Sequence, residues 1–236
     1  MKVGLIQSNF APWRGYFDFI DDCDVFIYYD DVQYTKHDWR NRNRIKTDKG
    51  TAWITVPVLH HGLSQTISEA RIDYSQDWAN RILGQLQTYY HRAAGYPIHI
   101  GAFRRIISSP FETVSQLNIA VSSWVMSVLG ISTPVRMSSE FSPVGTKTDR
   151  IIDIVRKAGG CAYLSGPAGR NYLEERKFFE NGIRLEYKRY EYASYPQMFG
   201  PFEPQVSVLD LLFNTVRADR GFWKSTAPSD VVAAPE

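Results

Sequence analysis

Two short apolar segments joined by one helical segment, all within the first 29 residues, constrain the fold more than any other feature. Residues 2–8 (KVGLIQS) and 25–29 (VFIYY) are apolar runs that end in polar residues, as buried strands do. Residues 15–20 between them carry three aromatic side chains and predict a short helix. A strand, a helix and a second strand in this order form a βαβ unit with parallel strands. We therefore expect an α/β protein.

The rest of the chain extends this pattern. Residues 76–130 predict a set of amphipathic helices, inserted after a strand at 51–59 that pairs with 65–72 in a β-hairpin. Further strands are expected at 133–138, 161–165 and 183–190, and further helices at 148–158, capped by Thr148, at 170–179 and at 208–216. The fold class is therefore α/β, with a mostly parallel central sheet flanked by helices, a β-hairpin and a helical insertion. We expect one domain over residues 1–225 and a flexible tail at 226–236.

The composition excludes several classes of protein. The chain has 27 Lys and Arg against 25 Asp and Glu, a net charge of +2, whereas general nucleic-acid binders are strongly basic. Cys23 and Cys161 fit no metal-ligand spacing, and we expect both to be buried thiols. The start lacks the apolar stretch of a signal peptide, and no apolar run reaches the roughly 20 residues that cross a bilayer. A cytoplasmic protein without a membrane span is expected.

Polar side chains follow the first two predicted strands at the point where each strand ends. Asp30 and Asp31 come directly after residues 25–29, and Gln7 and Asn9 end the first strand. Because open α/β sheets bind ligands outside the carboxyl ends of their strands, we expect these residues to lie at one ligand crevice. Which of the two carboxylates faces the crevice stays open, since successive strand side chains point to opposite faces.

A loop rich in basic, amide and aromatic groups is expected after the two carboxylates. Six basic residues fall within the 14 residues from Lys36 to Lys49, and such a cluster suits phosphates or another anion. The alternative is an ordinary solvated loop, because blocks of like charge are usually exposed. The polar and aromatic members considered for binding are Gln33, Trp39, Asn41, Arg42, Asn43 and Arg44.

Three other segments carry candidate groups. A strand, a glycine turn at 166–169 and the start of a helix form an anion cradle or, equally, a tightly packed turn. His60 and His61 are expected on a turn, where metal binding is disfavoured, but one of them could accept a proton because an unperturbed imidazole titrates near neutral pH. The segment 194–204 holds three prolines and three aromatic residues, and we expect it to be ordered against another part of the protein.

Several of these stretches together resemble the WbqC-like family of bacterial polysaccharide-locus proteins. The matching pieces are Gly4–Gln7 with Gly15–Phe17, YDDVQY at 29–34, WRNRNRI at 39–45, YLSGPAG at 163–169 and SYPQMFGPFEPQVSVLDLLFN at 194–214. Ser8 and the pair His37-Asp38 depart from the family pattern. The resemblance implies a role in O-antigen or related glycan biosynthesis. Because the family accompanies sugar aminotransferases, it also implies modification of an amino sugar.

An enzyme that transfers an acyl or aminoacyl group to the amine of a nucleotide-linked amino sugar would use all these groups. Acyl-CoA or aminoacyl-tRNA is the expected donor substrate, with no tightly bound cofactor. Asp31 or His61 would act as the base and Lys36 would stabilise the oxyanion. The arginines would hold the pyrophosphate, and Tyr16, Trp39 or Tyr195 would stack on a base or sugar. The candidate substrate-binding residues are Gln7, Asn9, Tyr16, Asp30, Gln33, Trp39, Asn41, Arg42, Asn43, Arg44, Ser165, Gly166, Gly169, Tyr195 and Gln197.

Three alternatives remain open from the sequence. The two carboxylates could hold Mg²⁺ for a nucleotidyl transfer, although no metal-ligand constellation stands out. A non-catalytic module that binds a sugar nucleotide or a pathway enzyme, such as a sugar aminotransferase, would need the same polar and aromatic groups without a base. Finally, Asp30 or Asp31 could form a structural ion pair with a loop arginine.

Overall fold

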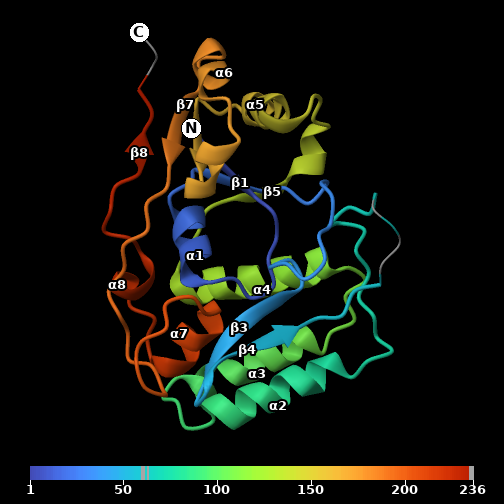
Figure 1. Ribbon diagram of the computed structural model, residues 1–236, viewed down its shortest axis with the longest axis vertical. Helices are drawn as coiled ribbons and strands as arrows, with labels where there is room; N and C mark the ends of the chain where they lie inside the picture. The colour runs from blue at the N-terminus through green and yellow to red at the C-terminus, as the bar shows by residue number, and fades with distance from the viewer. Residues whose placement is uncertain (60–61, 63, 234–236) are drawn as a thin grey trace.

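A six-stranded sheet is the centre of the molecule. The computed structural model describes residues 1–59, 62 and 64–233. The strands lie in the order β5-β2-β1-β6-β7-β8 (Figure 1). Their bounds are β1 Lys2–Ile6, β2 Val25–Tyr28, β5 Val135–Met137, β6 Ala162–Ser165, β7 Arg184–Tyr187 and β8 Asp230–Val231. All pairs are parallel except β7 with β8, which confirms the predicted α/β class with a mostly parallel sheet.

The chain changes direction across the sheet beside β1. It runs from β1 to the neighbouring β2 and on to β5, then returns to β6 on the other side of β1 and continues to β7. This reversal is the topological switch point, outside which open α/β sheets bind their ligands. The carboxyl end of β1 leads to Gln7, and that of β6 leads to Gly166. The order of the strands therefore points to the loop that follows β1.

Helices cover both faces of the sheet. Helix α1 (Arg14–Asp21) packs its aromatic residues with Phe26 and with helix α7 (Val208–Asn214). On the opposite face, α5 (Lys147–Lys157) and α6 (Glu175–Glu180) bury Ile154 and Phe178 against β1 and β7. The chain also forms helix α8 (Arg220–Trp223) and the 3₁₀ helices η1 (Ser138–Phe141) and η2 (Pro167–Asn171).

A separate antiparallel hairpin, β3 (Arg42–Thr47) with β4 (Gly50–Thr55), lies outside the sheet. The prediction of a loop over the basic stretch is therefore wrong at 42–47. The first four residues of β3 alternate as in a strand with one buried face: Asn43 and Ile45 are buried, whereas Arg42 and Arg44 face outward. The predicted pairing of 51–59 with 65–72 is confirmed only at its end among the described residues, where an antiparallel bridge joins Val58 to Ile72, because β4 pairs with β3.

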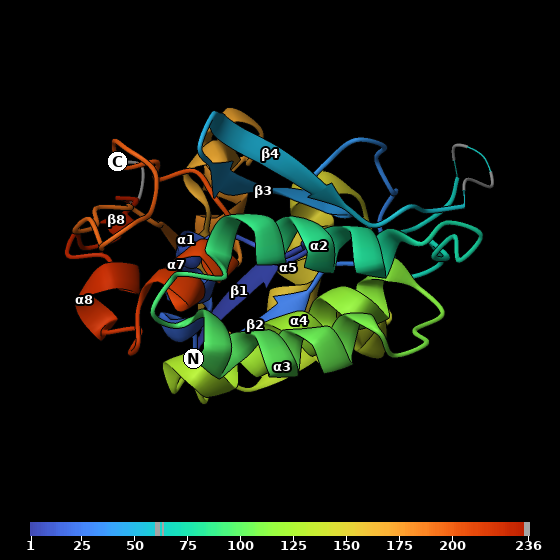
Figure 2. The same cartoon turned by 90° about the horizontal axis from the view of Figure 1, so that it is seen from below.

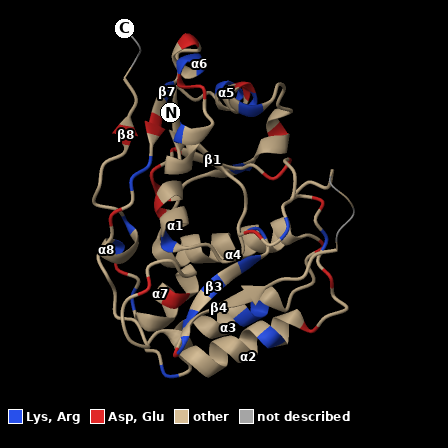
Figure 3. Cartoon of the chain, in the orientation of Figure 1, with Lys and Arg blue, Asp and Glu red and all other residues tan. Residues whose placement is uncertain are grey.

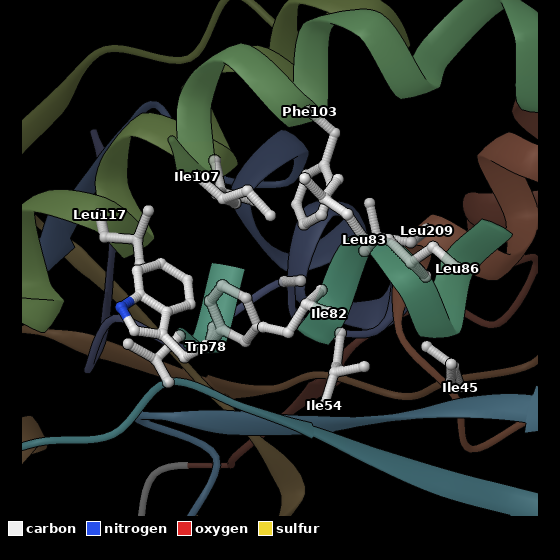
Figure 4. Close-up of a cluster of buried hydrophobic side chains, with 14 of the residues drawn as sticks. Ile45, Ile54, Trp78, Ile82, Leu83, Leu86, Phe103, Ile107, Leu117 and Leu209 are labelled. Atoms are coloured by element: carbon white, nitrogen blue, oxygen red, sulfur yellow. The ribbon is translucent and has the colours of Figure 1, made fainter. Parts of the chain in front are cut away.

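The helical insertion supplies the floor beneath this hairpin. Helices α2 (Trp78–Tyr90), α3 (Tyr96–Ile107) and α4 (Val114–Leu129) confirm the prediction of helices within 76–130. The hairpin lies over α2, as Figure 2 shows. Ile45 and Ile54 of the hairpin meet helix residues such as Ile82 in one buried cluster (Figure 4). Burial of this apolar face fixes the hairpin, whose outer face is left to solvent.

Several boundaries differ from the predictions. Helix α5 begins at Lys147 after the N-cap Thr146, while the hydroxyl of Thr148 accepts a hydrogen bond from the amide of Glu174. The predicted helix at 170–179 is split into η2 and α6. Cys23 is buried as expected, but Cys161 is exposed because it precedes β6. The segment 226–236, predicted as a tail, supplies strand β8 at the edge of the sheet.

Strand β7 is more buried than its sequence indicates. Alternation of apolar and charged residues predicts a half-exposed strand at 183–190, whereas Glu186 and Lys188 are both buried. The strand lies between β6 and β8, and Lys188 pairs with Asp18 of α1.

Ser207 caps α7 as predicted, accepting a hydrogen bond from the amide of Leu209. No helix in the described part of the chain is both long and apolar enough to cross a membrane.

Candidate functional site

A cleft of about 340 Å³ opens beside the carboxyl end of β1. One wall is the loop that follows β1, the second is the segment that leads into β3, and the third is the loop before α7. Its volume falls in the range of small-molecule sites, roughly 300–1,000 Å³. The lining residues are Asn9, Pro12, Trp13, Trp39, Asn43, Arg44 and Gln205. The structure thus brings four of the sequence candidates, Asn9, Trp39, Asn43 and Arg44, into one cleft.

Hydrogen bonds tie the three walls of this cleft together. The amide of Phe10 donates to the carbonyl of Trp39 at 2.9 Å. The side-chain amide of Asn43 donates to the carbonyls of Phe10 and Ala11, at 3.1 and 3.0 Å. From the third wall, the amide of Ser207 donates to the carbonyl of Arg44 at 2.8 Å. Asn43 is buried, and its side-chain amide hydrogen-bonds to the backbone of the neighbouring wall. Its role in the cleft is therefore structural.

Arg44 is the charged group of the cleft. Its guanidinium donates to Gln205 at 3.0 Å and lies 5.8 Å from the ring centre of Trp39 and 5.9 Å from that of Trp53. Within residues 1–59, 62 and 64–233, no carboxylate forms an ion pair with it. A guanidinium beside aromatic rings and without an acidic partner is suited to bind an anionic ligand that also carries a flat ring.

The outward face of the hairpin continues this surface. Arg42 lies over Trp53 at 4.2 Å, and the ring centres of Trp39 and Trp53 are 5.5 Å apart. Both tryptophans are 42% exposed, an unusual state for so large an apolar side chain. Basic residues mark the length of β3 in Figure 3. We call Trp39, Arg42, Arg44 and Trp53 the hairpin face.

The two carboxylates after β2 point in different directions, and neither lines the cleft. Asp30 is wholly buried and accepts hydrogen bonds from the amide of Ser8 at 2.7 Å and the hydroxyl of Ser115 at 2.5 Å. Asp31 is half-buried, pairs with Arg150 of α5 at 2.6 Å and accepts a hydrogen bond from Ser138. All four carboxylate oxygens thus have protein partners, which a Mg²⁺ ion would have to replace.

Two further candidates, Tyr195 and Gln197, belong to a buried polar cluster. Tyr195 and Gln197 donate to one oxygen of Asp210, at 2.7 and 2.6 Å, and Tyr90 donates to the other at 2.7 Å. Lys46 donates to Gln197 at 2.8 Å. This cluster orders the segment 194–204 against α7 and the hairpin, and it gives Tyr195 and Gln197 structural partners.

The Asp210 cluster predicts a specific pH dependence of stability. Burial raises the pKa of Asp210, although three hydrogen bonds act in the opposite direction. A carboxyl pKa that is higher in the folded state stabilises the fold below the unfolded pKa, about 3.9, and this contribution is lost as pH rises through the folded pKa. The advantage in unfolding free energy of wild type over Asp210→Asn should therefore shrink from about pH 3.5 upward, as urea denaturation at a series of pH values would show. An advantage that grows over this range would contradict the assignment.

Four further candidates within residues 1–59 do not line the cleft. Gln33 and Lys36 are exposed, and Asn41 is buried with its amide donating to the carbonyl of Val56 at 2.8 Å. Tyr16 is buried, and its hydroxyl donates to the carbonyl of Gln7 at 3.1 Å, so its ring offers no stacking surface. His61 lies outside the described residues. The catalytic roles of Asp31, Lys36 and His61 stay predictions.

The turn after β6 is closely packed. Ser165 is buried and donates to the carbonyl of Gly166 at 3.1 Å, and the amide of Gly169 donates to the same carbonyl at 3.0 Å. A Cβ atom at Gly169 would lie 2.2 Å from the hydroxyl oxygen of Ser165, so a larger residue there would force the Ser165 side chain to move. Close packing explains this glycine, and the following helix is a 3₁₀ helix of five residues. Anion binding at this turn stays a prediction.

Some residues of the cleft and of the hairpin face were not predicted from the sequence. Trp53 could have been found, because it faces Arg44 directly across the hairpin once β3 is taken as a strand. Trp13 and Gln205 carry no local signal, since they meet β3 only through the tertiary fold.

The fold and the cleft define a class of protein: an α/β domain with a parallel sheet, whose switch-point loop is covered by a basic and aromatic hairpin. The chain belongs to the WbqC-like protein family, which matches residues 7–220. It is 44% identical over 216 residues to the uncharacterized protein Rv1507c of Mycobacterium tuberculosis, covering 90% of this chain and 93% of that protein. No solved structure matched the chain.

Proposed function

We propose that this protein binds a nucleotide-linked amino sugar in the cleft and acts as a cytoplasmic transferase of glycan biosynthesis. One observation carries the proposal: Arg44, with no acidic partner in the described part of the chain, lies beside two exposed tryptophans near the switch point of the sheet. The bacterial polysaccharide context that the family resemblance implies supports the choice of ligand.

Each part of such a ligand has a matching group. The exposed ring of Trp39 is suited to stack on the base, as aromatic side chains do with nucleobases. Arg44 would pair with the pyrophosphate through charge-assisted hydrogen bonds. Asn9 and Gln205 lie on the cleft walls, where their amides would bind sugar hydroxyls.

The proposed reaction is acyl or aminoacyl transfer to the amine of the sugar. The amine nitrogen attacks the acyl carbon, a C–N bond forms, and the bond from that carbon to the thiol of CoA or the ribose hydroxyl of a tRNA breaks. The amine loses a proton to a base, and the leaving group takes one up. If Asp31 is this base, the ligand must displace Arg150 from it.

A non-catalytic binding module is the second candidate, and one observation favours it. None of the cleft-lining residues in the described part of the chain is a carboxylate or an imidazole. Such a module would present a sugar nucleotide to another pathway enzyme. Mg²⁺-dependent nucleotidyl transfer is less well supported, because Asp30 and Asp31 point in different directions.

Mass spectrometry would separate the two candidates. Purified protein would be incubated with UDP- and dTDP-linked amino sugars and with acyl-CoA or charged-tRNA donors, beside Asp31→Asn and Arg44→Ala. We expect a mass gain on one sugar, lost in Arg44→Ala through weaker binding. Loss in Asp31→Asn with binding retained would identify the base. Saturable binding without any mass gain would favour the module and contradict the transferase.

A further inference from the structure

We propose that Asn118 of α4 is a positioning residue that fixes the distance between two walls of the cleft. The proposal rests on the proposed function, because the cleft is taken as the ligand site. Asn118 is wholly buried and is not among the described lining residues of the cleft. Its effect on the ligand would therefore act through the backbone that carries Asn9 and Trp39.

The contacts of Asn118 reach both walls at once. Its side-chain amide donates to the carbonyl of Arg40 at 2.8 Å and to the hydroxyl of Ser8 at 3.2 Å. Ser8 directly precedes Asn9, and Arg40 directly follows Trp39. One amide nitrogen thus joins the two segments that carry these lining residues.

A second residue of α4 also supports the segment that carries Asn9, through Asp30. Ser115, three residues earlier on α4 and on the same face, donates to Asp30, which accepts the amide of Ser8. A direct hydrogen bond also joins the two walls, because the guanidinium of Arg40 donates to the side-chain oxygen of Asn9. The helical insertion therefore supports the cleft as well as the hairpin.

The energetics explain why an amide is needed here. If Asn118 were alanine, the carbonyl of Arg40 and the hydroxyl of Ser8 would lose a buried donor, and an unsatisfied buried acceptor is unfavourable. The walls would then depend more on the hydrogen bond from Phe10 to Trp39. Water entering between the walls would satisfy the lost acceptors and widen the cleft.

The amide proton of Phe10 reports directly on the distance between the walls. Its exchange would be measured by NMR without ligand in wild type, Asn118→Ala and Ser122→Ala. Ser122 is the matched control, because it is wholly buried one turn later on α4 and does not bond to either wall in the described contacts. We expect Phe10 exchange to be at least about tenfold faster in Asn118→Ala and unchanged in Ser122→Ala.

Calorimetric titration with UDP- and dTDP-linked amino sugars would give the second readout. We expect Asn118→Ala to raise the Kd about tenfold and Ser122→Ala to leave it within about twofold. A merely structural role would lower the Tm of Asn118→Ala and leave its Kd and its Phe10 exchange the same as in Ser122→Ala. If Asn118→Ala does not fold, Asn118→Ser, which keeps one donor, would be compared in the same way.

The outcomes distinguish this inference from the proposed function. Unchanged Phe10 exchange in a folded Asn118 variant would overturn the positioning role. Faster exchange with an unchanged Kd would overturn it too, because the wall distance would not matter to the ligand. A wild type that binds no sugar nucleotide would overturn the proposed function, and Phe10 exchange alone would then decide whether Asn118 holds the walls.

Discussion

Replacing Lys188 by methionine is expected to lower the free energy of unfolding by about 3 kcal/mol, because breaking a buried ion pair leaves a charge without its partner. Lys188 is only 2% exposed at the end of β7, and its ammonium lies 2.9 Å from a carboxylate oxygen of the wholly buried Asp18. It also lies 2.5 Å from Asp22. Lys224 approaches Asp18 at 3.3 Å and limits the loss, which places the expected value at the low end for such pairs.

Urea unfolding of two further variants would isolate the ion pair. Lys188→Met combined with Asp18→Asn should lose less stability than Lys188→Met alone, since both charges are removed. Arg176→Ala removes an ion pair from a solvent-exposed helix surface and should change the midpoint little. A loss below about 1 kcal/mol in Lys188→Met would show that the buried pair contributes no more than a surface pair does.

Replacing Arg44 by alanine is expected to raise the Kd for a nucleotide-linked amino sugar about ten- to a hundredfold. A hydrogen bond to a charged group contributes roughly 1.5–3 kcal/mol, and each 1.4 kcal/mol is a factor of ten in affinity. Since Arg44 is the only arginine among the described lining residues, no neighbouring arginine there can replace it. Trp39→Ala should raise the same Kd about tenfold, because the base loses its stacking surface.

A matched arginine elsewhere on the surface provides the control. Arg136 is half-exposed on β5 and pairs with Glu140, away from the lining residues of the cleft. Arg136→Ala should leave the Kd within about twofold of wild type in the same calorimetric titration. If Arg44→Ala and Arg136→Ala raised the Kd equally, the effect would be one of overall charge, which would argue against a defined contact between Arg44 and a phosphate.

The parallel centre of the sheet could be predicted because β1 and β2 are short apolar runs that end at polar residues. Residues 2–8 and 25–29 contain β1 and β2, and their parallel pairing follows from the helix between them. The three insertion helices follow from their apolar periodicity, with a Thr113–Gln116 capping box marking where α4 begins. Local pattern and tertiary structure agree in all of these elements.

The hairpin could not be predicted in the same way. Four of the six residues of β3 have charged or amide side chains, so the segment lacks the composition of a typical strand. Its strand structure depends on Ile45 and on the burial of Asn43, which bonds to carbonyls more than 30 residues away. A polar strand of this kind becomes recognisable only when its partners are known.

The sequence predicts which segments carry the candidate site, but it does not predict the long-range contacts that orient their side chains. The loop after β1, Trp39 and Arg44 follow from the rule that ligands bind outside the carboxyl ends of strands, together with the basic stretch. The directions of Asp30 and Asp31 depend on Ser115 and Arg150, more than 80 residues further along. Gln205 reaches Arg44 across 161 residues. Such pairings are set by packing and leave no mark on the local sequence.

A crystal structure with a bound amino-sugar nucleotide would test the central claim most directly. Wild-type crystals would be grown with the UDP- or dTDP-linked amino sugar that binds most tightly in calorimetry. We expect the base to stack on Trp39, the pyrophosphate to contact the Arg44 guanidinium and the sugar to lie between Asn9 and Gln205. A nucleotide bound at the turn after β6, with the cleft empty, would contradict it.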